Sequence, residues 1–190
     1  MPVTQCTVSA ILFINLMMIR FVSILLLLSF YNHLNAQQVQ CDCNLLINPA
    51  YFGKVSLYDR PNGKVIRSLK NDSLKENYLL VKAEKDSAGF VYGAIFYANS
   101  GKPKKGWIKK NKFLGTYSRN YGPELILYSD TDSKSKPAFI IREHVSEIGF
   151  CTVTQCRNKW VYVKLSNGTK EFSGWLSPNM QCANPYTTCN

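Results

Sequence analysis

The chain has 190 residues, of which 23 are Lys or Arg and 12 are Asp or Glu, so its formal net charge is +11. Charged residues make up only 18% of the sequence and hydrophobic residues 46%, which excludes a disordered polycationic tail. This length suits one domain of ordinary size or two small ones. Seven cysteines are many for a cytosolic enzyme of this size and point instead to an oxidising compartment.

The chain begins with a long apolar segment. Residues 11–30 are almost all apolar apart from Arg20. If the segment were a membrane helix, Arg20 would place a charge near its middle, which is unfavourable by about 3 kcal/mol. If the chain starts at Met18 instead, Arg20 becomes the positive residue at the start of a signal peptide. The sequence therefore predicts a hydrophobic export helix within a signal peptide over residues 1–36, cleaved after Ala36, with Met18 as a candidate true start. The predicted location is periplasmic or extracellular, and an uncleaved membrane anchor is the alternative.

Six cysteines remain after the predicted cleavage, and residues 44–150 contain none of them. An even number in an oxidising compartment favours disulfides, although fifteen pairings are open. One hypothesis links Cys41 or Cys43 to Cys182 or Cys189. The pattern lacks the paired Cys-x-x-Cys motifs of a zinc site, and no metal or cofactor is expected. The predicted disulfide cysteines are Cys41, Cys43, Cys151, Cys156, Cys182 and Cys189.

The middle of the chain repeats itself. Three landmarks recur in the same order at an offset of 70, 70 and 68 residues, so a two-residue insertion or deletion in a loop accounts for the difference. The landmarks are Leu57-Tyr58 with Leu127-Tyr128, Phe90-Val91-Tyr92 with Trp160-Val161-Tyr162, and Gly106-Trp107-Ile108 with Gly174-Trp175-Leu176.

Each repeat is patterned as short β-strands. Apolar and alternating segments end at turns rich in Gly, Asn and Pro, and no segment after the signal has sustained helical periodicity. This pattern predicts an all-β fold of small barrels. The expected strands are 55–58, 78–83, 90–97 and 106–108 in the first repeat, and 124–128, 149–154, 160–165 and 174–176 in the second.

Both repeats resemble bacterial SH3-like (SH3b) domains. The opening Leu57-Tyr58-Asp59-Arg60-Pro61-Asn62-Gly63-Lys64-Val65-Ile66 matches the start of that family, and the strand at 160–165 and Gly174-Trp175-Leu176 match its later strands. The first repeat departs from the family at Phe90, where Trp is usual. The resemblance implies two tandem SH3-like β-barrels, disulfide-stabilised, over residues 54–115 and 117–182. A cysteine-containing arm (37–53) would precede them, a tail (183–190) would follow, and residues 115–121 would form a short linker.

The resemblance also implies a function, because SH3-like barrels are mostly binding or targeting modules. The sequence contains no phosphate-binding glycine loop, and His144 is the only histidine after the predicted signal, so an enzyme is not expected. We expect an exported binding module for cell-envelope material such as peptidoglycan or its peptide stems. The alternative is a secreted interaction or structural protein that docks on an envelope protein.

Two sets of residues are candidates for ligand binding. Residues 54–115 contain fourteen basic and five acidic side chains, so most of the positive charge lies in the first repeat. This repeat is the candidate surface for an anionic polymer or a membrane, although lysines also protect exposed sheet edges, and export disfavours nucleic acid. The aromatic candidates for ligand contact are Tyr58, Tyr92, Trp107, Tyr128, Trp160 and Tyr162. The tyrosines combine an apolar body with a polar tip, and core packing is the alternative role for Trp107 and Trp160. The basic candidates, which surround Trp107, are Lys102, Lys104, Lys105, Lys109 and Lys110.

Overall fold

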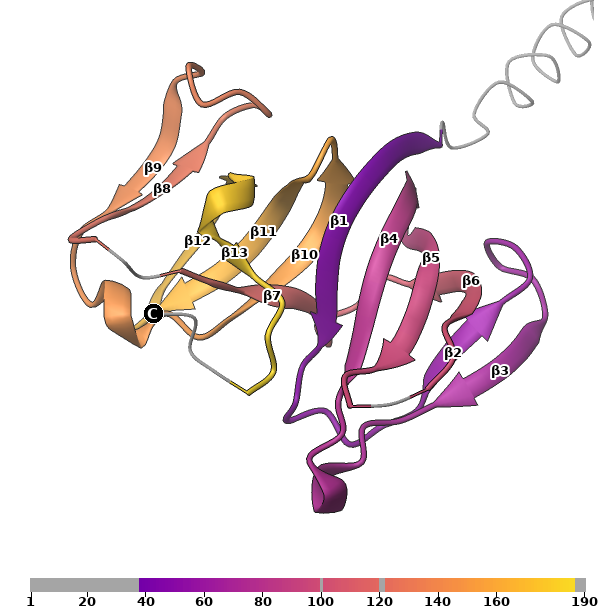
Figure 1. The fold of residues 1–190 in the computed structure, drawn as a ribbon. Coiled ribbons are helices and arrows are strands. Elements are labelled where there is room, and N and C mark those ends of the chain that lie inside the picture. The colour runs from indigo at the N-terminus through magenta and orange to yellow at the C-terminus, as the bar shows by residue number, and fades with distance from the viewer. Residues whose placement is uncertain (1–37, 100, 120–121, 187–190) are drawn as a thin grey trace, which may run out of the picture. The chain divides into compact units, whose positions relative to one another are not determined.

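The computed structural model describes residues 38–99, 101–119 and 122–186, which belong to one compact unit (Figure 1). The predicted signal peptide and Cys189 lie outside these residues. Among the residues described, no helix has the length and apolar character needed to span a membrane.

The described residues are almost entirely β-structure, as the sequence predicts. Three single-turn 3-10 helices are the only helical elements among them: η1 (Ser73–Lys75), η2 (Val145–Glu147) and η3 (Pro178–Met180). The strands are β1 (Val39–Ile47), β2 (Val55–Tyr58), β3 (Val65–Leu69), β4 (Leu79–Ser87), β5 (Phe90–Tyr97), β6 (Lys104–Lys109), β7 (Leu114–Ser118), β8 (Leu125–Tyr128), β9 (Pro137–Ile141), β10 (Phe150–Arg157), β11 (Trp160–Asn167), β12 (Lys170–Leu176) and β13 (Gln181–Cys182).

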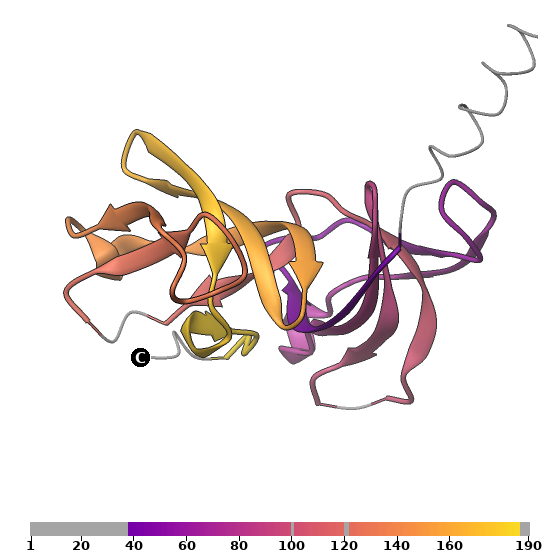
Figure 2. The same cartoon turned by 90° about the horizontal axis from the view of Figure 1, so that it is seen from above.

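The order of the strands shows the duplication. The hydrogen-bonded order is β3-β2-β6-β5-β4-β1-β7-β10-β11-β12-β8-β9, with β13 paired to β7. Read outward from the centre, β1-β4-β5-β6-β2-β3 and β7-β10-β11-β12-β8-β9 are the same arrangement. Figures 1 and 2 show the two sets, indigo to magenta and orange to yellow, meeting where β1, β7 and β10 lie.

The irregularities of the two sets also correspond. The β4–β5 ladder slips between Ala83 and Lys85, and the β10–β11 ladder slips between Val153 and Gln155. The ladders β2–β3 and β8–β9 likewise share a slip, at Leu57/Tyr58 and Leu127/Tyr128. Because a β-bulge is a specific local feature, equal bulges at an offset of 70 residues confirm the internal repeat.

The strands form one continuous antiparallel sheet, whereas the resemblance implied two separate barrels. The junction is the antiparallel pairing of β1 with β7, where Leu46 lies opposite Gly115 and Ile47 opposite Leu114. The predicted arm therefore contributes β1, which lies between β4 and β7. Residues 115–118 of the predicted linker belong to β7, and the strand arrangement of the second repeat begins at Leu114. Both strands depend on partners far along the chain, which explains why local patterns did not identify them.

One hydrophobic core runs through both repeats. Strands such as β2, β8 and β11 turn alternate residues inward. The residues that are at most 1% exposed include Leu57, Val91 and Ile108 of the first repeat and Leu127, Val161 and Leu176 of the second. These residues belong to a single cluster that also contains Cys43 and Cys156. The inward side chains fix which residues remain on the outer face of the sheet.

Candidate functional site: two aromatic rows

The first aromatic row crosses three neighbouring strands of the first repeat. Tyr58 on β2 and Tyr92 on β5 both lie opposite Trp107 on β6. The ring centroids of Tyr92 and Trp107 are 5.3 Å apart. Phe90 extends the row, with its ring edge-on to Tyr58 at 5.7 Å.

The second aromatic row repeats this geometry. Tyr128 on β8 and Tyr162 on β11 both lie opposite Trp175 on β12, and the rings of Tyr162 and Trp175 are 5.4 Å apart. Trp160 takes the place of Phe90, edge-on to Tyr128 at 5.5 Å. The sequence candidates are thus brought together in two matched sets. The candidate set omits Phe90 and Trp175, although the repeat offset points to both of them.

The rows lie on the face of the sheet opposite the core, because their sequence neighbours point inward. Trp107 is 7% exposed and Trp175 is 6% exposed, whereas the four tyrosines of the rows are half-buried. Each tryptophan therefore forms the floor of its row, and the tyrosines are its more exposed members. Burial thus separates the two residue types: the tryptophans are packed, and the tyrosines are partly accessible.

The two rows differ in the charges around them. Lys105 and Lys109 alternate with Trp107 along β6 and therefore share its face, and Lys85 Nζ lies 5.8 Å from the ring of Tyr92. The ammonium of Lys105 lies 2.7 Å from a carboxylate oxygen of Glu84, and this carboxylate raises the pKa of Lys105. Of the remaining basic candidates, Lys102 is exposed and Lys104 is half-buried.

The cations near the second row include Arg157 and the exposed Lys164, which alternates with Tyr162 along β11. The Arg157 guanidinium lies 5.7 Å from the ring of Trp175 and 3.6 Å from Asp130. Ser173 is hydrogen-bonded to the hydroxyl of Tyr162 at 3.4 Å.

Lys110 does not belong to this surface, contrary to the sequence prediction. Its side chain is 10% exposed, and its ammonium lies 2.8 Å from the carboxylate of Asp86. The other oxygen of Asp86 accepts a hydrogen bond of 2.8 Å from the backbone N–H of Cys156 in the second repeat. Burial raises the pKa of Asp86, and the hydrogen bonds from Lys110 and Cys156 oppose that shift. The pair is a buried link between the repeats.

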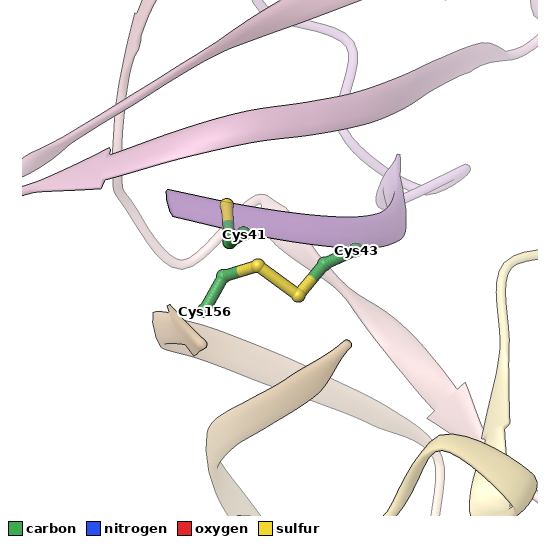
Figure 3. A group of neighbouring side chains, drawn as sticks. All are labelled: Cys41, Cys43 and Cys156. Atoms are coloured by element: carbon green, nitrogen blue, oxygen red, sulfur yellow. A yellow bond between two sulfur atoms is a disulfide. The ribbon is translucent and has the colours of Figure 1, made fainter. Parts of the chain in front are cut away.

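The cysteines pair differently from the hypothesis. Cys43 on β1 is bonded to Cys156 on β10, across 113 residues, so β1 is tied to the second repeat itself and not to its C-terminal tail (Figure 3). Cys41 and Cys151 are free and buried, although disulfides were expected for both. Cys182 is disulfide-bonded, and its partner is not among the described cysteines.

The sulfur atoms of Cys41, Cys43 and Cys156 lie within 4.8 Å of one another. Three thiolates at this spacing would suit a soft metal ion, but metal ligation needs deprotonated sulfur. With Cys43 and Cys156 bonded to each other, only Cys41 offers a thiol. Burial raises the pKa of Cys41 to about 12, with Asp86 adding to the shift. The cluster as it stands is therefore a disulfide beside a protonated thiol.

The surroundings of Cys151 and His144 also shift the pKa values of these residues. Burial raises the pKa of the other free thiol, Cys151, to about 12 as well. His144 is exposed and hydrogen-bonded to Glu147 at 2.8 Å, which raises the pKa of the imidazole. A catalytic cysteine needs the opposite environment, in which the thiolate is stabilised.

No protein-family profile, curated protein or solved structure matches this chain. The SH3-like resemblance therefore rests on the quoted motifs and on their duplication.

Proposed function

We propose that this protein is an exported, non-catalytic binding module whose repeats are SH3-like and attach to cell-envelope material, namely peptidoglycan or its peptide stems. The observation that carries the proposal is the duplicated aromatic row on the outer face of the sheet. A buried tryptophan floor flanked by tyrosine edges offers both an apolar contact area and hydroxyl groups to a ligand. Two such rows on one molecule strengthen attachment to a repetitive polymer through multivalency.

The surroundings of the first row support an electrostatic contribution. Lys85, Lys105 and Lys109 lie around this row, so an anionic polymer is attracted to the first repeat more than to the second. Such attraction between exposed charges is screened by salt over about 8–10 Å at physiological ionic strength. We therefore expect charge to assist binding and the aromatic rows to determine its specificity.

Co-sedimentation with purified cell-wall sacculi tests the proposal. The double variant Tyr92→Ala/Tyr162→Ala removes one exposed ring edge from each row and is expected to weaken binding about tenfold, which corresponds to about 1.4 kcal/mol. Phe52→Ala is the matched control, because Phe52 is an exposed aromatic residue (70%) outside both rows. Absence of wild-type binding at low salt, or equal loss in the double variant and the control, would contradict the proposal.

A charge-reversal variant separates specific binding from general attraction. Lys104→Glu/Lys105→Glu/Lys109→Glu is expected to weaken sedimentation at low salt and to match the wild type once moderate salt screens these charges. If the wild type itself lost all binding at moderate salt, non-specific charge would explain the attachment and the aromatic rows would not.

One observation favours the alternative function, docking on an envelope protein. β3 and β9 end the strand order of the described residues, so each pairs on one side only. They carry the exposed apolar residues Val65, Ile66, Phe139 and Ile140. An open edge with apolar side chains suits strand addition by a partner. Recovery of one stoichiometric envelope protein, lost in Ile66→Lys/Phe139→Lys, would support this alternative.

A further inference from the structure

A cleft of about 760 Å³ lies where the two repeats meet. Its first wall comes from β1, β4 and β5, and its second from Arg119 after β7, the β10–β11 turn, and the segment from η3 through β13. A cleft of this size suits a small ligand or a peptide of a few residues. It shares no lining residue with either aromatic row.

The lining is predominantly positive. Lys82 on β4, Arg119 and Lys159 supply three cations, and Asp42 on β1 supplies one carboxylate. The Asp42 carboxylate is 3.9 Å from Lys82 and 4.0 Å from Lys159, at the limit of an ion pair, and both lysine side chains are more than half exposed. One acid shared between two ammonium groups leaves the cleft attractive to an anion.

Lys159 occupies a backbone position that does not favour lysine. Asn158 and Lys159 form the β10–β11 turn with φ values of 48° and 71°. The corresponding residue in the first repeat, 70 positions earlier, is Gly89, with φ of 75°. A side chain in this left-handed region is unfavourable, and glycine adopts it without that penalty. The turn itself therefore does not require lysine, and what the lysine adds is a cation at the cleft.

Local hydrogen bonds hold the backbone of Lys159, and the remaining lining suits a peptide. The side-chain amide of Gln181 donates to the carbonyl of Lys159 at 2.8 Å, and Arg119 Nε donates to the carbonyl of Gln181 at 2.9 Å. Leu80 and Phe96 are apolar, and Asn44 brings an amide to the same cleft. Apolar contacts with a few placed polar groups are typical of small-ligand sites.

From this geometry we propose that the cleft binds a short peptide segment bearing a carboxylate, with Lys82 and Lys159 contacting the carboxylate from opposite repeats. The site is separate from the aromatic rows, and the inference does not depend on the proposed function.

The test is an NMR titration of the purified, 15N-labelled protein with the tripeptide acetyl-Ala-Glu-Ala, whose C-terminal carboxylate is free. We expect the amide signals of Lys82, Lys159 and Gln181 to shift, and the neutral peptide acetyl-Ala-Gln-Ala-amide to leave them in place. Shifts confined to other surfaces, or equal shifts with the neutral peptide, would overturn the proposal.

Lys159→Gly separates binding from stability. It is expected to weaken binding of acetyl-Ala-Glu-Ala about fivefold, which is the upper range for an exposed charge contact. It is also expected to raise the melting temperature by about 2–4 °C, because glycine relieves the backbone strain at this position of the turn. Lys134→Gly is the matched control, because it removes the same charge from an exposed turn outside the cleft. Equal weakening in both variants would show a long-range charge effect and contradict the site. Lys82→Ala is a second variant from the opposite wall, with the same expected loss of binding.

Discussion

At the scale of single residues, two lysines close together in the sequence have opposite roles. Lys105 is an exposed residue beside Glu84, and Lys110 is buried against Asp86. Both belong to the same lysine-rich segment, so the composition of the sequence does not distinguish them. The difference arises because Asp86 lies next to β10 of the other repeat. There its carboxylate also accepts a hydrogen bond from the backbone N–H of Cys156.

We predict that Lys110→Met lowers the free energy of unfolding by about 3–5 kcal/mol, because it leaves a buried carboxylate without its cation. Lys105→Met is the control, and its loss should stay below about 1 kcal/mol, the usual limit for an exposed ion pair. Urea denaturation at neutral pH measures both changes. Equal effects from the two substitutions would contradict the buried role of Lys110.

The same variant has a predicted pH dependence. Burial already raises the pKa of Asp86 above its usual value of 3.8, so the stability linked to its protonated form is fully present below that value and is lost as pH rises through the raised pKa. Removing the Lys110 ammonium takes away a group that opposes this shift and so raises the pKa further. The difference between Lys110→Met and the wild type should therefore shrink as the pH is lowered through the acid range.

At the scale of elements, β7 shows why the two repeats share a sheet. Gly115 lies opposite Leu46 of β1 on one side and opposite Thr152 of β10 on the other. A Cβ at this position would lie 2.1 Å from the carbonyl oxygen of Cys151 and 2.7 Å from the ring of Phe150. The absence of a side chain lets β7 approach β10 closely.

Gly115→Ala is therefore predicted to lower the free energy of unfolding by about 3 kcal/mol, because the methyl group collides with backbone that cannot move independently. Gly149→Ala is the matched control, since a Cβ there meets nothing within 4 Å and its effect should be within about 1 kcal/mol of zero. Chemical denaturation compares the two. A neutral Gly115→Ala would mean that β7 is not held tightly between β1 and β10.

Most strands could be predicted from the sequence, because a half-buried strand has a local period of two residues. The segment 55–58 is an example: Val55 and Leu57 point into the core while Ser56 and Tyr58 point outward. β1 was missed, because its alternation runs through cysteines and polar residues that also suit a disulfide-bonded arm. Its strand conformation depends on pairing with β4 and β7, which lie far along the chain.

At the scale of the whole molecule, the repeats are joined by the sheet, the common core and the Cys43–Cys156 bond. The disulfide closes a separation of 113 residues, and in the chain-entropy model a loop of this length is stabilised by about 4–5 kcal/mol. The sheet and the core join the repeats independently of the bond. Removing the disulfide should therefore lower the free energy of unfolding, while the two repeats still unfold together in one cooperative transition.

We predict that Cys41→Ser/Cys43→Ser loses about 4–5 kcal/mol of unfolding free energy and still unfolds in a single transition. Both residues are changed because the Cys41 sulfur, within 4.8 Å of Cys156, is placed to replace Cys43 as its partner. Cys41→Ser alone is the control, because it introduces one of the two buried hydroxyl groups and leaves the Cys43–Cys156 bond intact. Calorimetry measures both variants, and two separate transitions would show that the repeats fold independently.

Three properties follow from the amino-acid sequence alone: the duplication, the all-β class and most positions of the aromatic rows. Strand periodicity and a fixed repeat offset can be recognised without the folded structure. Four other properties emerge only in the folded chain: the single sheet that the repeats share, the Cys43–Cys156 bond, the burial of Lys110, and the positive cleft where the repeats meet. Each of these depends on which distant segments come into contact. No local pattern contains that information, since pairing partners are selected by the free energy of the whole packed core.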